Sequence, residues 1–207
     1  MKTIELDTPH GLAKAHVHAA EDGGAALVLG HGAGGGVTAP DLLAATRAAL
    51  AENVSVVLVE QPYRVAGRRS PAPARQLDAV WTSVVDQLRS GELRGMPLLV
   101  GGRSSGARVA CRTAAETDAV GVLCLAFPLQ PPRRSGSEPA PSRLAELDAV
   151  TVPTLVVQGV RDPFGIPPAA ARRTVVQVES DHGLKGDLEA VAAAVRAWLP
   201  QLVLASG

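Results

Sequence analysis

Residues 98–114 read LLVGGRSSGARVACRTA, and this stretch decides the fold. It opens with the apolar run 98–100, which follows a proline and is typical of a buried central strand. The pattern G-x-S-x-G comes next, from Gly102 to Gly106, and small residues then recur at helical spacing. A strand, a tight turn and a helix in this order are the context that a nucleophile elbow requires, with Ser104 at the turn.

The tight turn explains why a glycine stands on both sides of Ser104. The backbone of an elbow is strained, and side chains two residues before or after the serine would collide with their surroundings. Gly102 and Gly106 avoid this collision because they have no Cβ. In the helix that follows, Arg108 and Arg112 share the face that we expect to meet water. The alternative is a glycine-rich surface turn that carries two serines.

The composition is that of a folded, neutral chain. Its 207 residues are enough for one domain, residues 1–207, with a full core, and 46% of them are hydrophobic. Lys and Arg together number 20, as do Asp and Glu, so the zero net charge argues against nucleic-acid or membrane-surface binding. Neither a signal-peptide core nor a membrane-length apolar run is present. Cys111 and Cys124 lie in apolar contexts typical of reduced core thiols, so we expect a cytoplasmic protein.

The two ends of the chain carry simple patterns. Residues 2–19 alternate between apolar and polar around a turn signal, which predicts an antiparallel hairpin. On its polar face, His16 and His18 could ligate a metal, but no cysteine or carboxylate cluster completes such a site. We therefore expect both histidines to face solvent, and we expect no metal. Near the other end, a helix is predicted for residues 188–199, and Pro200 should stop it.

A glycine-rich loop, HGAGGG at residues 31–36, follows the next apolar strand. A backbone N–H in such a loop, here that of Ala33, can bind the negative oxygen of a reacting carbonyl group. The stretch from Gly30 to Gly35 also matches G-x-G-x-x-G, and the following strand ends in Glu60, where a ribose-binding acid would lie. This second interpretation makes the chain a nucleotide-binding oxidoreductase.

The helix predicted after this loop favours the first interpretation. It should begin with Thr38 as its N-cap, Pro40 in the first turn and Asp41 completing a capping box. The glycines then lie too far from the helix N-terminus to place a pyrophosphate on it. Two strands also precede the motif, whereas a dinucleotide-binding unit usually begins with it.

Two arginine-rich loops follow strands and are expected at the mouth of the site. The first covers residues 61–73. The second, residues 127–142, is too short for a folded cap, and its Arg133 and Arg134 would hang over the site. Such charges would favour an anionic substrate, whereas the alternative is that they pair with surface acids. The residues expected to contact substrate are His31, Gly32, Tyr63, Arg64, Arg68, Arg69 and Arg103.

Two further polar residues stand just past predicted strands. Asp162 follows the strand at 154–157, and His182 follows the strand at 174–178. Together with Ser104 they supply the nucleophile, the general base and the orienting acid that acyl transfer requires. Ser104 would attack a carbonyl, His182 would accept its proton, and Asp162 would hold the imidazole in the right tautomer.

The remaining parts of such a site also have candidates. The backbone N–H groups of Ala33 and Ser105 would bind the oxyanion. Asp181 stands next to His182 and is an alternative acid. We prefer Asp162 because it ends a strand one step earlier in the chain.

Together these patterns resemble the α/β-hydrolase superfamily over nearly the whole chain. The likeness is greatest to a small, cap-poor group akin to dienelactone-hydrolase-like bacterial proteins, which includes hydrolase-like domains of a testis-expressed protein and of a histone-acetyltransferase complex subunit. The motifs that carry it are His31-Gly32-Ala33-Gly34, Glu60-x-Pro62-Tyr63-Arg64, Gly101-Gly102-Arg103-Ser104, Phe127-Pro128-Leu129, Gly159-x-x-Asp162-Pro163-Phe164 and Asp181-His182.

The resemblance implies an α/β-hydrolase fold: a mostly parallel sheet with helices on both faces, an N-terminal antiparallel hairpin and no substantial cap. It also implies the triad and oxyanion roles at the matching positions. Dienelactone hydrolases use a cysteine nucleophile, so Ser104 argues against dienelactone as the substrate.

We therefore expect a serine hydrolase, carboxylesterase-like, that cleaves a small ester or thioester through an acyl-enzyme. It should need no cofactor, and its partners should be a substrate that can carry an anionic group and a second copy of the chain in a homodimer. The alternatives are the nucleotide-binding oxidoreductase that uses Gly30 to Gly35 and Glu60, and a non-catalytic interaction scaffold that kept the fold.

Overall fold

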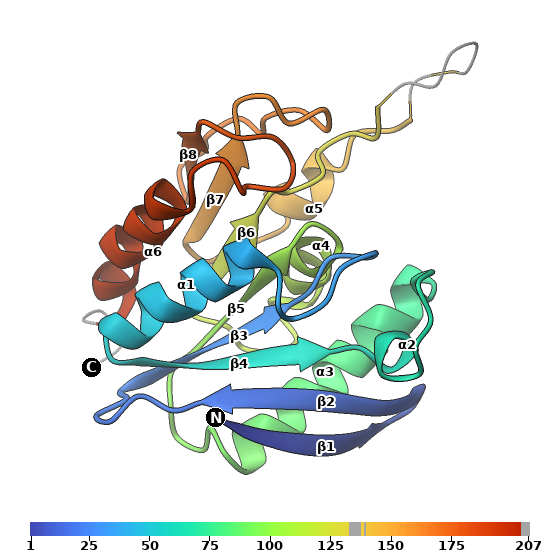
Figure 1. The fold of residues 1–207 in the computed structure, drawn as a ribbon, viewed down its shortest axis with the longest axis vertical. Coiled ribbons are helices and arrows are strands. Elements are labelled where there is room, and N and C mark those ends of the chain that lie inside the picture. The colour runs from blue at the N-terminus through green and yellow to red at the C-terminus, as the bar shows by residue number, and fades with distance from the viewer. Residues whose placement is uncertain (133–137, 139, 204–207) are drawn as a thin grey trace.

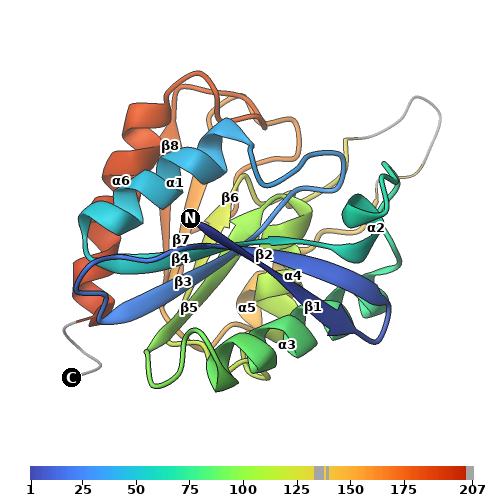
Figure 2. The ribbon, with the colours of Figure 1, turned by 60° about the horizontal axis from the view of Figure 1, so that its bottom comes forward.

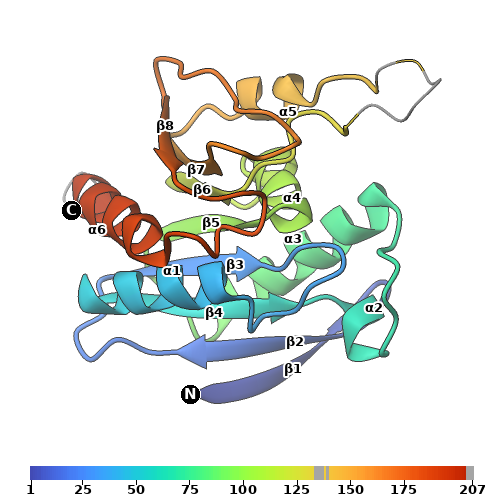
Figure 3. The same ribbon diagram turned by 45° about the horizontal axis from the view of Figure 1, so that its top comes forward.

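The computed structural model describes residues 1–132, 138 and 140–203, so Arg133 and Arg134 lie outside the described residues. Within that part of the chain, one eight-stranded sheet has the order β1-β2-β4-β3-β5-β6-β7-β8. Figure 3 shows the strands in this order, from β8 at the top to β1 at the bottom. The strands are β1 Lys2–Thr8, β2 Gly11–His18, β3 Ala25–Gly30, β4 Val54–Glu60, β5 Leu98–Arg103, β6 Gly121–Leu125, β7 Thr154–Gly159 and β8 Arg173–Val178.

The predicted architecture is confirmed in the direction of the strands. β1 and β2 form the antiparallel hairpin, and β2 is also antiparallel to β4. All pairs from β4 across to β8 are parallel. Because parallel strands end at the same edge of a sheet, the loops that follow β3 to β8 meet on one side of the molecule.

Helices cover both faces of the sheet, as predicted (Figure 1). Figure 2 shows α1 and α6 above the sheet and α3, α4 and α5 below it, whereas the short α2 follows β4 at the edge. The helices are α1 Pro40–Ala51, α2 Pro62–Val65, α3 Ala74–Ser90, α4 Ser105–Thr113, α5 Leu144–Asp148 and α6 Leu188–Val203.

The sheet separates two hydrophobic layers, and the central strands contribute side chains to both of them. In β3, Ala26 and Val28 join the layer under α3 and α4, whereas Leu27 and Leu29 join the layer under α1 and α6. This alternation follows from the two-residue period of a strand. A strand buried on both faces is apolar throughout, which is why residues 25–30 show no polar alternation.

Two predicted helix ends are wrong. Ala39, not Thr38, is the N-cap of α1, and it makes no side-chain capping bond. Asp41 does not complete a capping box, because its carboxylate turns into the protein toward Arg103. At the other end, Pro200 does not stop α6, which runs on to residue 203. A proline removes only one hydrogen bond so near a helix end, and Leu202 beyond it is still buried against the sheet.

Arg108 and Arg112, which were predicted to face solvent, are only partly exposed because both form ion pairs. Arg108 places Nε 2.9 Å from Oε2 of Glu146, and Arg112 places Nε 2.9 Å from Oδ2 of Asp78. These planar, two-pronged pairs tie α4 to α5 and α3. The sequence could not show this, because the acidic partners come from other helices.

Three further expectations concern the cap, the thiols and membrane spans. The described residues between β6 and α5 build no folded cap. Cys111 and Cys124 are buried free thiols whose Sγ atoms lie 3.4 Å apart, as predicted for core cysteines. Among the described residues, no helix is both long and apolar enough to span a membrane.

Candidate active site

The turn between β5 and α4 holds Ser104 in a strained conformation. Its φ of 51° and ψ of −106° lie outside the regions that residues with a Cβ normally occupy. The backbone N–H of Ser104 donates to the carbonyl of Leu125 at 2.9 Å, which ties the turn to β6. Strain of this kind lifts the serine hydroxyl above the sheet edge, as an elbow requires.

The neighbouring strand β3 explains the two glycines of the elbow. A Cβ added to Gly102 would lie 2.5 Å from the carbonyl oxygen of Gly30, and one added to Gly106 would lie 2.4 Å from the same oxygen. Both contacts are with backbone, so no side-chain movement could relieve them. The end of β3 therefore passes too close to the elbow for any residue except glycine.

We predict that Gly102→Ala destabilises the fold by about 2 kcal/mol or more, because the new Cβ overlaps the Gly30 carbonyl. The measurement is urea denaturation followed by circular dichroism. Gly24→Ala is the matched control, since nothing lies within 4 Å of its added Cβ, and it should change stability by less than about 0.5 kcal/mol. Equal stabilities of the two variants would contradict the close approach.

The structure brings Ser104, His182 and Asp162 together, although each comes from a different loop. The Oγ of Ser104 lies 2.9 Å from Nε2 of His182. On the other side of the ring, Nδ1 lies 2.8 Å from Oδ2 of Asp162. The Asp162 side chain is fully buried, whereas that of His182 is 19% exposed. A substrate can therefore reach the serine and the imidazole but not the carboxylate.

Two groups whose role the sequence analysis did not predict hold Asp162 in place. Nε2 of the buried Gln158 donates to Oδ2 at 2.8 Å, and the backbone N–H of Phe164 donates to Oδ1 at 2.9 Å. The Phe164 ring also packs against the His182 ring, with centroids 4.4 Å apart. Gln158 had a visible signal, because a polar amide directly follows the apolar run Leu155 to Val157 in the strand TLVVQG.

Asp181, the alternative acid, lies elsewhere. Its side chain is exposed, and Oδ1 accepts a hydrogen bond from the backbone N–H of Gly183 at 2.8 Å. The contact with the His182 ring belongs to Asp162. The arrangement thus matches our preferred order of serine, aspartate and histidine.

The glycine loop lies directly beside the elbow. A Cβ added to Gly32 would lie 3.7 Å from the Cβ of Ser104, so the backbone leading into Ala33 passes close to the nucleophile. Ser105 opens α4, and N–H groups in the first turn of a helix have no acceptor within the helix. The two candidate oxyanion donors therefore come from segments that flank the serine.

His31 and Tyr63 support this loop, which differs from their expected role as substrate contacts. His31 is buried; its Nε2 accepts from the Gln61 backbone N–H at 3.1 Å, so Nδ1 carries the proton and donates to the Gly32 carbonyl at 2.8 Å. The Tyr63 hydroxyl donates to the Ala33 carbonyl at 2.8 Å. The polar atoms of both side chains form hydrogen bonds with backbone groups and stabilise the conformation of the loop.

We predict that His31 makes folding sensitive to acid. Burial lowers its pKa below the ordinary 6.5, so the unfolded chain binds this proton more tightly than the folded one. The stability that neutral His31 contributes is complete above pH 6.5 and is lost as the pH falls through the lowered pKa. The free energy of unfolding should therefore fall more steeply in wild type than in His31→Gln between about pH 7 and pH 5.

Urea denaturation across that pH range measures both slopes. His10→Gln, at an exposed histidine of the hairpin turn, is the control for the substitution itself. Identical slopes for His31→Gln and wild type would show that His31 does not respond to acid.

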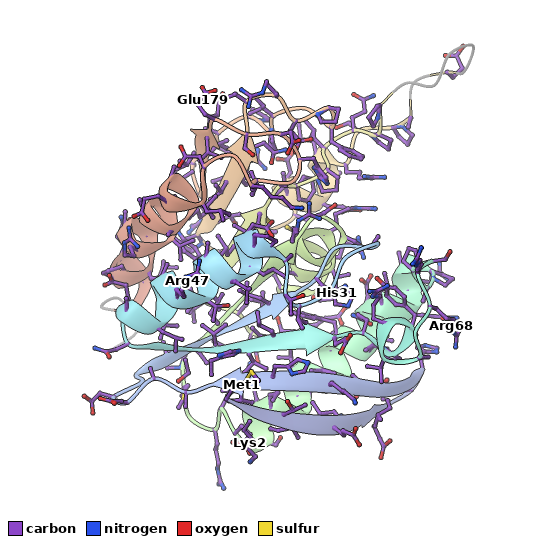
Figure 4. All side chains as sticks on the ribbon, viewed as in Figure 1. Met1, Lys2, His31, Arg47, Arg68 and Glu179 are labelled. Carbon is purple, nitrogen blue, oxygen red and sulfur yellow. The ribbon has the colours of Figure 1, made fainter. Side chains whose placement is uncertain are left out.

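The described arginines that were expected at the mouth of the site have different surroundings. Arg103 is committed to Asp41 and to the backbone carbonyl of His182. Arg64 donates from Nη1 to the Arg68 carbonyl at 3.2 Å. Arg68 and its neighbour Arg69 are exposed, and Figure 4 places Arg68 at the outer edge beside α2, well away from His31. Arg103, which was expected to contact substrate, therefore binds groups of the protein itself.

Metal and nucleotide sites are not supported by the described residues. Among them, no group of three His, Cys, Asp or Glu side chains could hold a metal ion. Glu60, the ribose-binding acid of the oxidoreductase interpretation, lies with Oε2 3.7 Å from Nε2 of His16 on the neighbouring strand β2. The hydrogen bond with Cys111 and burial hold the pKa of the Cys124 thiol well above its usual range, so Cys124 is no rival to Ser104 as a nucleophile.

A strained serine between a central parallel strand and a helix, followed along the chain by the aspartate and then the histidine, is the arrangement of α/β hydrolases. Residues 23–187 match the model of a family described as an alpha/beta hydrolase domain. This span is more than half of the chain, so the chain belongs to the α/β-hydrolase family. Family membership, together with the sheet order, argues against the oxidoreductase interpretation.

Solved structures show the same fold across almost the whole chain. XC6422 from Xanthomonas campestris, an α/β serine hydrolase without a lid, is 19% identical with a TM-score of 0.75, covering 97% of this chain and 94% of that one. Est1E from Butyrivibrio proteoclasticus is 14% identical with a TM-score of 0.79, covering 99% and 100%. The dienelactone hydrolase of Anabaena variabilis is 15% identical with a TM-score of 0.75, covering 97% of each chain. No curated protein matches the chain by sequence.

Proposed function

We propose that the chain is a serine hydrolase that cleaves small esters or thioesters through an acyl-enzyme. The observation that carries this proposal is the unbroken chain of contacts from Ser104 through His182 to Asp162, at 2.9 Å and 2.8 Å. Fold neighbours named as serine hydrolases and esterases give independent support.

In the first half of the reaction, Oγ of Ser104 attacks the substrate carbonyl while Nε2 of His182 takes its proton. Asp162 stabilises the imidazolium that forms. The N–H groups of Ala33 and Ser105 bind the oxyanion. His182 then returns the proton to the leaving alcohol or thiol.

In the second half, a water molecule attacks the acyl-enzyme with His182 again as the base, which releases the acid and regenerates Ser104. Buried free thiols fit a reducing compartment, so we place this activity in the cytoplasm.

The size of the substrate follows from the missing cap. The described residues between β6 and α5 form no folded layer over Ser104, so the protein can enclose only the groups next to the carbonyl. We therefore propose that short acyl groups are preferred. Arg103 is already paired with Asp41, so this residue gives a charged ester no advantage over a neutral one.

The test is an acyl-chain series of p-nitrophenyl esters, from acetate to dodecanoate, with matching thioesters. The proposal expects the highest kcat/KM at the short end and complete loss of activity after treatment with a fluorophosphonate. A chain that hydrolyses none of these compounds and is not labelled would be a scaffold. Tight, saturable binding of NAD would instead support the oxidoreductase.

A further inference from the structure

Arg103, the residue before Ser104, reaches two other segments of the chain. Its Nε lies 3.0 Å from Oδ2 of Asp41, at the start of α1. Its Nη2 donates to the backbone carbonyl of His182 at 3.0 Å. The side chain is 19% exposed, so most of the guanidinium is enclosed by these partners. One residue thus connects the elbow to the loop that carries the histidine.

Asp41 gives this connection a fixed anchor. Its side chain has no exposed surface, and Oδ1 also accepts the backbone N–H of Leu42 at 3.0 Å. A buried carboxylate is costly unless a cation pairs with it, so the ion pair holds Arg103 in one orientation. The α1 helix, packed on the sheet, therefore sets where the guanidinium lies.

The third nitrogen, Nη1, lies against the glycine loop. A Cβ added to Gly32 would be 2.8 Å from this atom, so the guanidinium fills the space beside that glycine. The loop that leads into Ala33, the elbow and the His182 loop consequently all pack around one planar group. A guanidinium can do this because its donors point in fixed directions within a plane.

We propose that Arg103 is a positioning residue, which uses Asp41 as its anchor to hold the His182 loop and the glycine loop against Ser104. This inference rests on the proposed hydrolase function and adds a determinant of its rate. Arg103 touches the backbone of His182 rather than its ring, so it acts on the distance between the base and the nucleophile. Small losses of such alignment cost about 10²-fold in rate.

The experiment compares Arg103→Met, Arg103→Lys and Asp41→Asn with a control, Arg196→Met. Arg196 forms an exposed ion pair with Glu189 on α6. The control therefore removes an arginine–carboxylate ion pair that does not contact Ser104. The readouts are kcat and KM for a neutral ester and for its carboxylate-bearing analogue, together with the melting temperature.

A positioning role predicts that Arg103→Met lowers kcat about 10- to 100-fold for both esters, with KM changed less than about threefold. Arg103→Lys should keep the melting temperature closer to wild type, because its charge still meets Asp41, but a single ammonium cannot span both partners and kcat should stay low. The double variant with Asp41→Asn should be no slower than Arg103→Met alone, since the two residues act as one unit.

Three results would overturn the inference. A selective rise in KM for the carboxylate ester would make Arg103 a substrate contact. Full kcat in a folded Arg103→Lys would show that a positive charge beside Asp41 is enough for catalysis. If Arg103→Met does not fold, the kcat of Arg103→Lys is the deciding measurement. If the losses in kcat of Arg103→Met and Asp41→Asn added up in the double variant, the two residues would act independently, which contradicts the proposal. A wild-type chain with neither hydrolysis nor fluorophosphonate labelling would instead reject the hydrolase itself.

Discussion

Replacing Ser104 with alanine should lower kcat for a short-chain ester by about three to six orders of magnitude. The nucleophile is lost, and only the oxyanion donors and substrate binding remain to accelerate attack by water. The fold should be unaffected, because alanine keeps the Cβ that already tolerates the φ of 51° at this position. The backbone N–H bond to Leu125 is kept as well.

The measurement is the initial rate on p-nitrophenyl acetate beside the melting temperature of each variant. Ser90→Ala is the matched control, because Ser90 is an exposed serine at the end of α3. It should retain wild-type turnover. If Ser104→Ala kept more than about a tenth of wild-type kcat, the hydrolysis would proceed without the elbow.

Asp162→Asn should give the second largest loss, about 10³- to 10⁴-fold in kcat. The amide oxygen can accept the Phe164 N–H, but the amide nitrogen then faces His182 and the donating Gln158. A donor in that position forces the imidazole into the tautomer that cannot take the proton of Ser104. Activity falls although the side chain keeps its shape.

The matched control is Asp181→Asn, which removes the neighbouring exposed carboxylate and should change kcat less than about twofold. Both variants are assayed with the same ester across a range of pH. The opposite ranking, with Asp181→Asn the slower enzyme, would make Asp181 the orienting acid.

The sequence predicted the fold well because its signals are local. The order of apolar strand, G-x-S-x-G and small-residue helix depends on neighbouring residues only, and the structure has β5, the strained Ser104 and α4 at those positions. The chain order of Ser104, Asp162 and His182 is likewise visible, since each follows an apolar run. The sequence predicted that a Cβ at Gly102 or Gly106 would collide with its surroundings. It could not identify the colliding group, the Gly30 carbonyl, because that contact depends on the pairing of β3 with β5.

The sequence could not predict how the supporting residues are used. Asp41 matched a capping pattern, yet its carboxylate serves Arg103, which lies 62 positions further along the chain by residue number. His31 looked like a residue of a binding loop, but Gln61 and the Gly32 carbonyl occupy its nitrogens. Such roles depend on contacts between segments that are distant in sequence, and these contacts cannot be predicted from residue type alone.

The central claim is that Ser104 is the activated nucleophile, and fluorophosphonate labelling tests it most directly. Trypsin cuts after Arg103 and Arg108, so the labelled site falls in the peptide of residues 104–108, SSGAR. Fragmentation of this peptide by mass spectrometry separates Ser104 from Ser105. We predict one adduct, on Ser104, that is absent in Ser104→Ala and forms far more slowly in Asp162→Asn. An adduct on Ser105, or no adduct on the wild-type chain, would contradict the account.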